Sequence, residues 1–327
     1  MIDKAIQYYL AKNTEVDYKT FETPAHTFFK RLYWNRKDIE DIIPECKKKE
    51  LDDNFAKLNI DVSEEQVNKY KDVLDTFKQI ESAGLYTSQG LEYTSYNLFT
   101  KTGRPSNSID GTNYAALNKE DGTRKKYTSR FTGGVLAEFD YDAYHLRLIA
   151  NLIDYPTPSE SFHKHLGKLY FDSDNLTDEQ YKESKLITFR ILYGGVPDEF
   201  MEIEYFKLVD DYISALWNTY NRKGYIETPI LKKRFYKKNF DNLNSQKLFN
   251  YMIQAYETES NYIILKDIFK MLEDKESKMI LYIYDAFLFD ISPSDGKEIM
   301  KEIKDIMKIP TTLHIGKNYH DMQNFDI

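Results

Sequence analysis

The sequence is poor in cysteine and in long hydrophobic runs. Cys46 is the one cysteine among 327 residues, which excludes an intrachain disulfide framework and a zinc site made of several cysteines. A reducing compartment is therefore favoured. Residues 1–19 carry a charge every few positions, and no uncharged apolar run approaches the roughly 18 residues of a membrane-spanning helix. We expect a cytoplasmic protein with neither a signal peptide nor a membrane partner.

Aromatic and charged side chains are abundant instead. The chain has 27 Tyr and 20 Phe, and charged residues make up 30% of it, as in a folded globular protein. The net charge of −8 by itself argues weakly against a nucleic-acid partner, but the local distribution of charge matters more than the sum. Two basic clusters, 119–130 and 232–238, are either solvated faces or, for the first, a contact for backbone phosphates.

Hydrophobic periodicity predicts an α+β architecture with a small antiparallel sheet and many helices. Turn residues and apolar runs set the boundaries of its elements. In chain order we predict a helix over 64–84 that Gly84 ends, a buried strand over 133–140, mainly helices over 143–275, a β-hairpin over 279–291, a helix over 295–308 and a short strand over 311–315.

Two aspartates follow strongly apolar strands. Asp140 closes the predicted strand 133–140, and Asp285 lies near the turn of the predicted hairpin. If these strands pair in one sheet, the two carboxylates converge at its edge. Phosphoryl transfer from a nucleoside triphosphate uses such a pair to hold two Mg²⁺ ions about 3.5–4 Å apart. The alternative is that each aspartate merely ends a strand.

A helix predicted over 177–195 carries a cation and two rings on one face. Thr177 and Gln180 form a capping box at its start, and a glycine pair ends it. Lys185, Phe189 and Tyr193 are spaced four residues apart, so they share a face. This face could meet a triphosphate and stack on any base, or it could be an aromatic stripe buried in the core.

Seven segments in chain order resemble motifs of the family A DNA polymerases, the bacterial DNA polymerase I type. DYDAYHLRLIANL (140–152) resembles motif A, KLITFRILYGG (185–195) fits motif B, and IYDAFLFDI (283–291) fits motif C. The supporting segments are TKTGRPSN (100–107) followed by Asn113, SFHKHLGKLYF (161–171), the pair Asn250 and Gln254, and GKNYHDM (316–322). The resemblance spans roughly residues 70–327.

The resemblance implies a right-hand fold with palm, fingers and thumb. The expected domains are a short helical thumb over 1–80, the first part of the palm over 81–160, the fingers over 161–240 and the second part of the palm over 241–327. A proofreading exonuclease does not fit in this length. We therefore expect a compact, phage-encoded version that works in the host cytoplasm and relies on a separate exonuclease, processivity or other replication chain.

The resemblance also implies an activity: addition of dNTPs to a DNA primer 3′ end on a template, with pyrophosphate release. The metal ligands for two Mg²⁺, or Mn²⁺, would be Asp140, the Tyr141 carbonyl and Asp285, and Lys185 would join the aspartates in catalysis. The nucleotide-binding residues would be His145, His163, Lys182, Lys185, Phe189 and Tyr193. The primer–template contacts would be Arg104, Asn113, Arg147, Asn250, Gln254 and Tyr284.

The sequence departs from the family pattern at several positions. His145 replaces the motif A glutamate that excludes ribonucleotides, and its bulk could serve the same exclusion. Ala286 replaces the motif C glutamate, which removes a third carboxylate that Asp142 or Asp290 could replace. Tyr181 replaces an arginine one turn before Lys185, for which the neighbouring Lys182 could stand in, and Gln246 replaces an arginine expected one turn before Asn250. These losses weaken the electrostatic stabilisation on which phosphoryl transfer depends.

Two other functions remain open on the sequence. One is a single-subunit RNA polymerase relative, although Phe189 stands where that type carries methionine and His145 is bulky. The other is a catalytically weak or inactive subunit that binds primer–template for a multi-chain polymerase, which Ala286 and the missing arginines favour.

Overall fold

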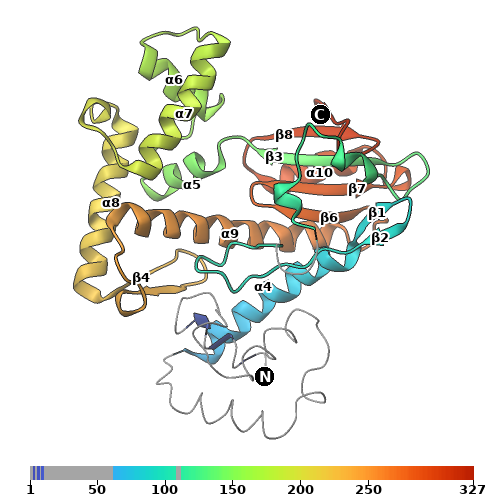
Figure 1. Ribbon diagram of the computed structural model, residues 1–327, viewed down its shortest axis with the longest axis horizontal. Coiled ribbons are helices and arrows are strands. Elements are labelled where there is room, and N and C mark those ends of the chain that lie inside the picture. The colour runs from blue at the N-terminus through green and yellow to red at the C-terminus, as the bar shows by residue number, and fades with distance from the viewer. Residues whose placement is uncertain (1–2, 4–5, 8, 11–61, 108–111) are drawn as a thin grey trace, which may run out of the picture.

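The computed structural model describes residues 3, 6, 7, 9, 10, 62–107 and 112–327. Two lobes stand side by side, and the long helix α9 (Ser245–Met271) runs from one to the other (Figure 1). We call residues 144–240 the helical lobe, and α4 (Glu64–Ala83) together with the central sheet the sheet lobe. Cys46 and most of the range 1–80 expected as a thumb lie outside the described residues.

A five-stranded antiparallel sheet forms the centre of the sheet lobe, with strand order β6-β7-β3-β8-β9. Four consecutive residues of β3, from Leu136 to Phe139, are buried, so both faces of the sheet are covered there. The α+β class predicted from the sequence is thus confirmed. The strands are β3 (Val135–Tyr141), β6 (Lys278–Ile283), β7 (Ala286–Ile291), β8 (Thr311–Gly316) and β9 (Gln323–Asn324).

Helix α4 packs into the core of the sheet lobe. A capping box at Ser63 and Gln66 starts it, and Gly84 ends it with a φ of 64° that only glycine adopts freely. Its buried stripe includes Phe77, whose ring lies 5.1 Å from that of Tyr282 in β6. The described part of the expected thumb therefore packs on the palm-like sheet and is not separated from it at residue 80.

Helix α10 (Glu298–Met307) also serves the sheet lobe. Its buried residues Ile299, Ile303 and Met307 recur at helical spacing, so one apolar stripe joins the same core. A small hairpin, β1 (Leu85–Thr87) and β2 (Gly90–Glu92), follows α4 directly.

The helical lobe has its own apolar core. Leu146, Phe162, Ile191 and Phe206, from successive helices, are all buried in it. The helices are α5 (Tyr144–Leu152), α6 (Phe162–Phe171), α7 (Asp178–Gly194) and α8 (Glu204–Lys223). In Figure 1, α6 and α7 rise above α5, and α8 forms the outer side of the lobe.

Helix α9 is the shared spine of the two lobes. Its 27 residues span about 40 Å at about 1.5 Å per residue. Near its start, Phe249 and Ile253 join the core of the helical lobe, and near its end Leu265 and Ile268 join the sheet core. A helix that is apolar on several sides is buried along its length, and this burial fixes the position of one lobe relative to the other.

A second hairpin lies inside the range predicted to be mainly helical. It is formed by β4 (Tyr225–Glu227) and β5 (Arg234–Tyr236), and their Tyr225 and Tyr236 rings are 5.5 Å apart. The sequence prediction missed it because three-residue strands are too short for a period-two pattern to register. None of the described helices is both long and apolar enough to cross a membrane.

Asp290 provides a test of the sheet lobe's stability. It is fully buried in β7, where its carboxylate accepts hydrogen bonds from Ser129 Oγ at 2.6 Å and Arg130 Nε at 2.8 Å. Removing one partner of a buried pair leaves an uncompensated charge. We expect Asp290→Ala to lower the free energy of unfolding by about 3–5 kcal/mol in urea titrations, while Lys301→Ala, which breaks an exposed pair with Asp305, changes it by less than about 1 kcal/mol.

Candidate active site

The strand end and the hairpin tip that carry the two aspartates meet at one edge of the sheet. Ile283 pairs with Ala286, so the β6–β7 turn consists of Tyr284 and Asp285 alone. Ala286 lies opposite Asp140 in β3. The Tyr141 N–H of β3 also donates to the Asp285 carbonyl at 3.0 Å. The pairing of β7 with β3 therefore brings the two acidic residues next to each other.

Both carboxyl groups have a pKa raised above the usual value of an aspartate. Burial, followed by the charges of Asp285 and Glu138, raises the pKa of Asp140 to about 7. Asp285 stands at an exposed turn, yet loss of water around its carboxyl and the nearby charge of Glu257 raise its pKa as well. A nearby cation would favour the ionised form of both carboxyl groups, and carboxylate oxygens are ligands that Mg²⁺ accepts, so these residues fit a divalent metal.

The described residues contain no group of three or more His, Cys, Asp or Glu side chains arranged to hold a metal. Any ion at this edge would need further oxygen ligands, as Mg²⁺ takes from substrate phosphates and water. Of the two suggested replacement carboxylates, Asp290 lies opposite Leu136, four residues along β3 from Asp140, and is bonded to Arg130. The expectation that Asp290 could complete the metal site is thus wrong.

Asp142 and Arg147 form an ion pair with each other. The Arg147 guanidinium is buried and donates to the Asp142 carboxylate at 2.8 Å and to the carbonyls of Pro158 and Glu160. Asp142 also accepts from Ser161 Oγ at 3.0 Å. Here the structure corrects two expectations. Arg147 has no exposed group for a primer–template contact, and Asp142 is occupied in holding the chain that leads into α6.

The α7 face that was predicted to bind the nucleotide is partly exposed to solvent. The capping box of Thr177 and Gln180 is formed, and Gly195 caps the end of the helix. Phe189 and Tyr193 are 44% and 39% exposed, and their rings stack 6.1 Å apart. They therefore do not form a buried core stripe. Lys185 lies on the same face, near enough to lower the pKa of Asp140 by its charge, and Lys182 is exposed.

His163 lies behind this face. Its ring centre is 5.5 Å from that of Phe189, and the residue is only 6% exposed. Burial, followed by the charge of Lys185, lowers the pKa of His163 to about 4. At neutral pH the imidazole is uncharged, so it could meet a phosphate only as a neutral hydrogen-bond donor. Its Nδ1 has no hydrogen-bond partner among the described residues.

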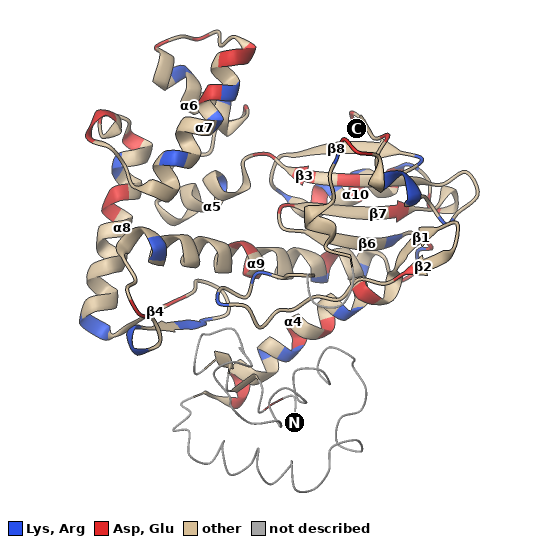
Figure 2. Cartoon of the chain, viewed as in Figure 1, with Lys and Arg blue, Asp and Glu red and all other residues tan. Residues whose placement is uncertain are grey.

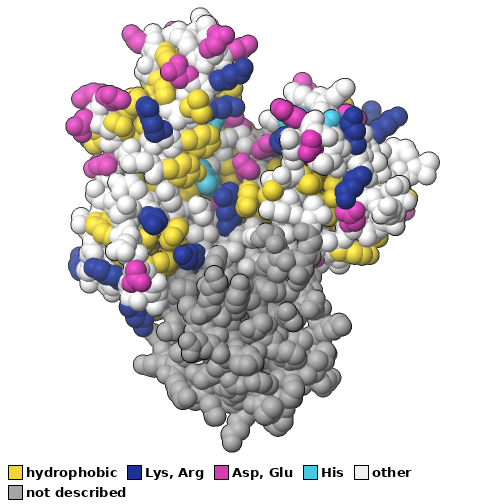
Figure 3. Space-filling view, in the orientation of Figure 1, with side chains coloured by type: hydrophobic (Ala, Val, Ile, Leu, Met, Phe, Trp, Pro, Cys, Tyr) yellow, Lys and Arg dark blue, Asp and Glu magenta, His cyan; other side chains and the backbone are white. Residues whose placement is uncertain are grey.

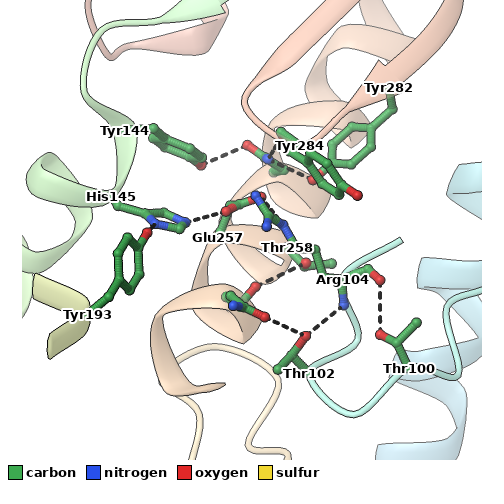
Figure 4. A network of polar contacts seen from close by, with 12 residues as sticks. Thr100, Thr102, Arg104, Tyr144, His145, Tyr193, Glu257, Thr258, Tyr282 and Tyr284 are labelled. Carbon is green, nitrogen blue, oxygen red and sulfur yellow. Dashed lines mark hydrogen bonds and ion pairs between the residues drawn. The ribbon is translucent and has the colours of Figure 1, made fainter. Parts of the chain in front are cut away.

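Glu257 is a site residue that the sequence analysis did not identify. It lies on α9 with its side chain 1% exposed, and its carboxylate is bonded to both Arg104 and His145. The other nitrogen of His145 lies 2.7 Å from the Tyr193 hydroxyl (Figure 4). A glutamate in the middle of an apolar helix was the available signal, but only the fold reveals what surrounds it.

The hairpin tip is anchored by polar contacts as well. The carbonyl of Tyr284 accepts a hydrogen bond at 3.0 Å from the buried Asn261 of α9, whose oxygen accepts one from Tyr144 at 2.7 Å. The Arg104 guanidinium lies 3.8 Å from the Tyr284 ring centre. These contacts offset the left-handed φ of 55° at Tyr284, a conformation that costs a bulky residue about 1–3 kcal/mol.

The other expected primer–template residues have different surroundings. Gln254 accepts from Thr102 Oγ1 at 3.4 Å, so it lies beside the 100–107 segment and Arg104. Asn250 is half-buried on α9, and its side-chain oxygen has no hydrogen-bond partner among the described residues. Asn113 is exposed two positions after residue 111, the last of the residues 108–111 that are not described.

The basic cluster 119–130 is partly committed to internal contacts. Arg124 is buried and donates to the Leu117 carbonyl at 2.9 Å, and Lys126 pairs with Glu92 at 2.9 Å. Lys119 remains exposed, and its charge lowers the pKa of Asp140. In Figure 2, Lys and Arg also gather at the β4–β5 hairpin and the end of α8, on the far side of the helical lobe from the sheet.

The space-filling view shows a cleft between the helical lobe and the sheet lobe (Figure 3). The sheet carries the paired aspartates, and α7 carries Lys185 and two exposed rings. The structural comparison shows that a solved polymerase domain shares this fold. The POL domain of Pol1 from M. smegmatis, in a complex with DNA primer-template and dNTP, matches with a TM-score of 0.60 and 18% identity over 78% of this chain and 52% of that one.

The sequence comparison finds one similar protein of known name. DNA polymerase I from Synechocystis sp. is 22% identical over 229 residues, which are 55% of this chain and 23% of that protein. No family model matches the sequence. The chain thus spans less than a quarter of that relative's length and about half of the solved chain's. This similarity agrees with the resemblance to the family A DNA polymerases that the motifs predicted, whereas a phage origin stays a prediction.

The raised pKa of Asp140 predicts how stability depends on pH. The folded protein binds a proton on Asp140 up to about pH 7, whereas an unfolded aspartate loses it near pH 3.8. Stability therefore falls as pH rises between these values. Asp140→Asn removes this ionisation. We expect the gain in the free energy of unfolding of the metal-free protein over wild type, measured in urea, to be larger at pH 8 than at pH 4 by more than about 1 kcal/mol. Asp305→Asn, at an exposed position, is the control, and an equal effect of both changes would contradict the assignment.

Proposed function

We propose that this chain is a DNA-directed DNA polymerase that extends a primer 3′ end with dNTPs and releases pyrophosphate. The observation that carries the proposal is the meeting of Asp140 and Asp285 at one edge of the sheet, opposite the open face of α7. The dNTP and primer–template of the matched Pol1 complex agree with this choice of substrates.

The two aspartates would hold two divalent ions, Mg²⁺ or Mn²⁺, with the Tyr141 carbonyl as a further ligand. When bound, such ions stabilise the attacking and leaving oxygens of an in-line displacement. The chain's own groups do the rest. Lys185 offers its charge to the departing pyrophosphate, with exposed Lys182 one turn nearer the start of α7. Because phosphoryl transfer depends on positioning and charge, few further groups are needed.

The remaining site residues divide between the two lobes. On the α7 side, Phe189 and Tyr193 present flat rings on which any base can stack. On the sheet side, Arg104 lies against Tyr284 beside Asp285, where it could reach the primer end. Gln254 is proposed for the same duplex because it adjoins the loop that carries Arg104, and Asn250 and Asn113 stay proposals on the resemblance alone.

A non-catalytic primer–template subunit is the second candidate, because Ala286 stands where a third carboxylate is expected and neither Asp142 nor Asp290 replaces it. Reliance on a separate exonuclease or processivity chain, and work in a host cytoplasm, are proposals from the resemblance. An RNA polymerase activity is less favoured, since Phe189 stands where that type carries methionine and His145 is bulky.

Primer extension with Mg²⁺ tests the catalytic proposal. We expect Asp140→Ala and Asp285→Ala each to reduce dNTP incorporation by about a thousandfold or more, because each removes ligands from both ions. Wild-type protein should use rNTPs poorly. Asp305→Ala, at an exposed position on α10 where the aspartate pairs with Lys301, should extend normally. Extension that survives both active-site changes would refute the metal assignment, and a wild-type protein that binds primer–template without extending it would favour the subunit alternative.

Lys185→Ala should separate nucleotide use from primer binding. Loss of its charge is expected to raise the KM for dNTP by about ten- to a hundredfold, because a charge-assisted hydrogen bond contributes about 1.5–3 kcal/mol. The affinity for primer–template, measured by fluorescence anisotropy, should stay within about twofold. Lys207→Ala, an exposed lysine on α8, is the matched control. An unchanged KM would remove Lys185 from the site.

A further inference from the structure

Glu257 is a charged group buried at the junction of the two lobes. Its side chain is 1% exposed on α9, where an unpaired carboxylate would be strongly unfavourable. One oxygen accepts from Arg104 Nε at 3.2 Å, and the other is bonded to His145 Nε2. The carboxylate is therefore shared between a side chain from the 100–107 loop and one from α5.

Arg104 and His145 each contact a further aromatic residue (Figure 4). Arg104 lies over the ring of Tyr284, the residue before Asp285, at 3.8 Å from the ring centre. His145 reaches the Tyr193 hydroxyl at 2.7 Å, and the Tyr193 ring stacks on Phe189. A continuous line of contacts thus runs from the hairpin tip of the sheet lobe, through Glu257, to the last turns of α7.

This line lies where an incoming nucleotide would need both lobes placed correctly. The nucleotide must fit between the paired aspartates and the α7 face, and Glu257 lies close enough to Asp285 to affect its carboxyl. A buried ion pair adds little stability compared with apolar packing, so its presence calls for another explanation. One shared carboxylate makes the placement of Arg104 depend on the placement of His145 and Tyr193.

We propose that Glu257 is a positioning residue that couples Arg104 at the primer end to the His145–Tyr193 pair beside α7, so that both sides of the nucleotide site are set by one buried carboxylate. Glu257 itself touches neither substrate nor metal in this arrangement. The inference rests on the proposed polymerase function, and it deepens that function by assigning a residue that controls how tightly the nucleotide is held.

The test compares Glu257→Gln with wild type. Glutamine keeps the shape and one acceptor but loses the charge that holds two donors, so the KM for dNTP should rise about tenfold while kcat changes by less than about threefold. Tyr193→Phe removes the hydroxyl group that contacts His145. It should raise KM about fivefold in wild type but less than about twofold in Glu257→Gln, because residues in one network are not additive.

Glu259→Gln is the matched control. Glu259 is equally buried two residues further along α9, but its carboxylate accepts from the backbone N–H groups of Ile230 and Leu231. It should leave the KM within about twofold even if it lowers the melting temperature as much as Glu257→Gln does. The same KM change in both variants, or additive effects of Glu257→Gln and Tyr193→Phe, would show a merely structural role and overturn the proposal.

A binding measurement separates this inference from the catalytic proposal. Calorimetric titration of dNTP into the complex with a dideoxy-terminated primer–template needs no turnover. Wild type that binds dNTP but does not extend primers would refute catalysis, and a Kd about tenfold weaker in Glu257→Gln would still support the positioning role. Equal Kd values for the two proteins, or no measurable binding by wild type, would overturn it.

Discussion

The pairing of β3 with β7 is the constraint on which the site depends. A two-residue turn fixes Asp285 directly before β7. The register that sets Ala286 opposite Asp140 then brings the two aspartates together at one edge of the sheet. A shift by one residue would turn the side chains of the strand to the opposite face. The tip is held further by Asn261, which links the Tyr284 carbonyl to Tyr144 through α9.

The site is built on opposed charges held in partly buried positions. Like charges at Asp140 and Asp285 raise the pKa of the first carboxyl to about 7, with burial as the larger cause. Lys119 and Lys185 act in the opposite direction from two different parts of the chain. This balance keeps the edge ready for a cation and keeps positive charge where a triphosphate would arrive.

Helix α9 holds the helical lobe and the sheet lobe in a fixed position relative to each other. It contributes to the cores of both lobes, and its polar residues Gln254, Glu257 and Asn261 contact the 100–107 loop, α5 and the hairpin tip in turn. The carboxylate missing at Ala286 is not replaced by Asp142 or Asp290, which pair with Arg147 and Arg130. Two other acids lie near the aspartates, Glu138 in β3 and Glu257 from a different element.

Local pattern in the sequence determined the elements and the residues that carry chemistry: the helix at 64–84, the hairpin around Asp285, the capping box of α7 and the shared face of Lys185, Phe189 and Tyr193. These follow from short-range periodicity and backbone preference. Tertiary structure alone decided that Arg147 is internal, that His163 is buried and uncharged, and that Glu257 joins Arg104 to His145. Burial and partners separated by more than a hundred residues depend on how distant elements pack, which no local pattern encodes.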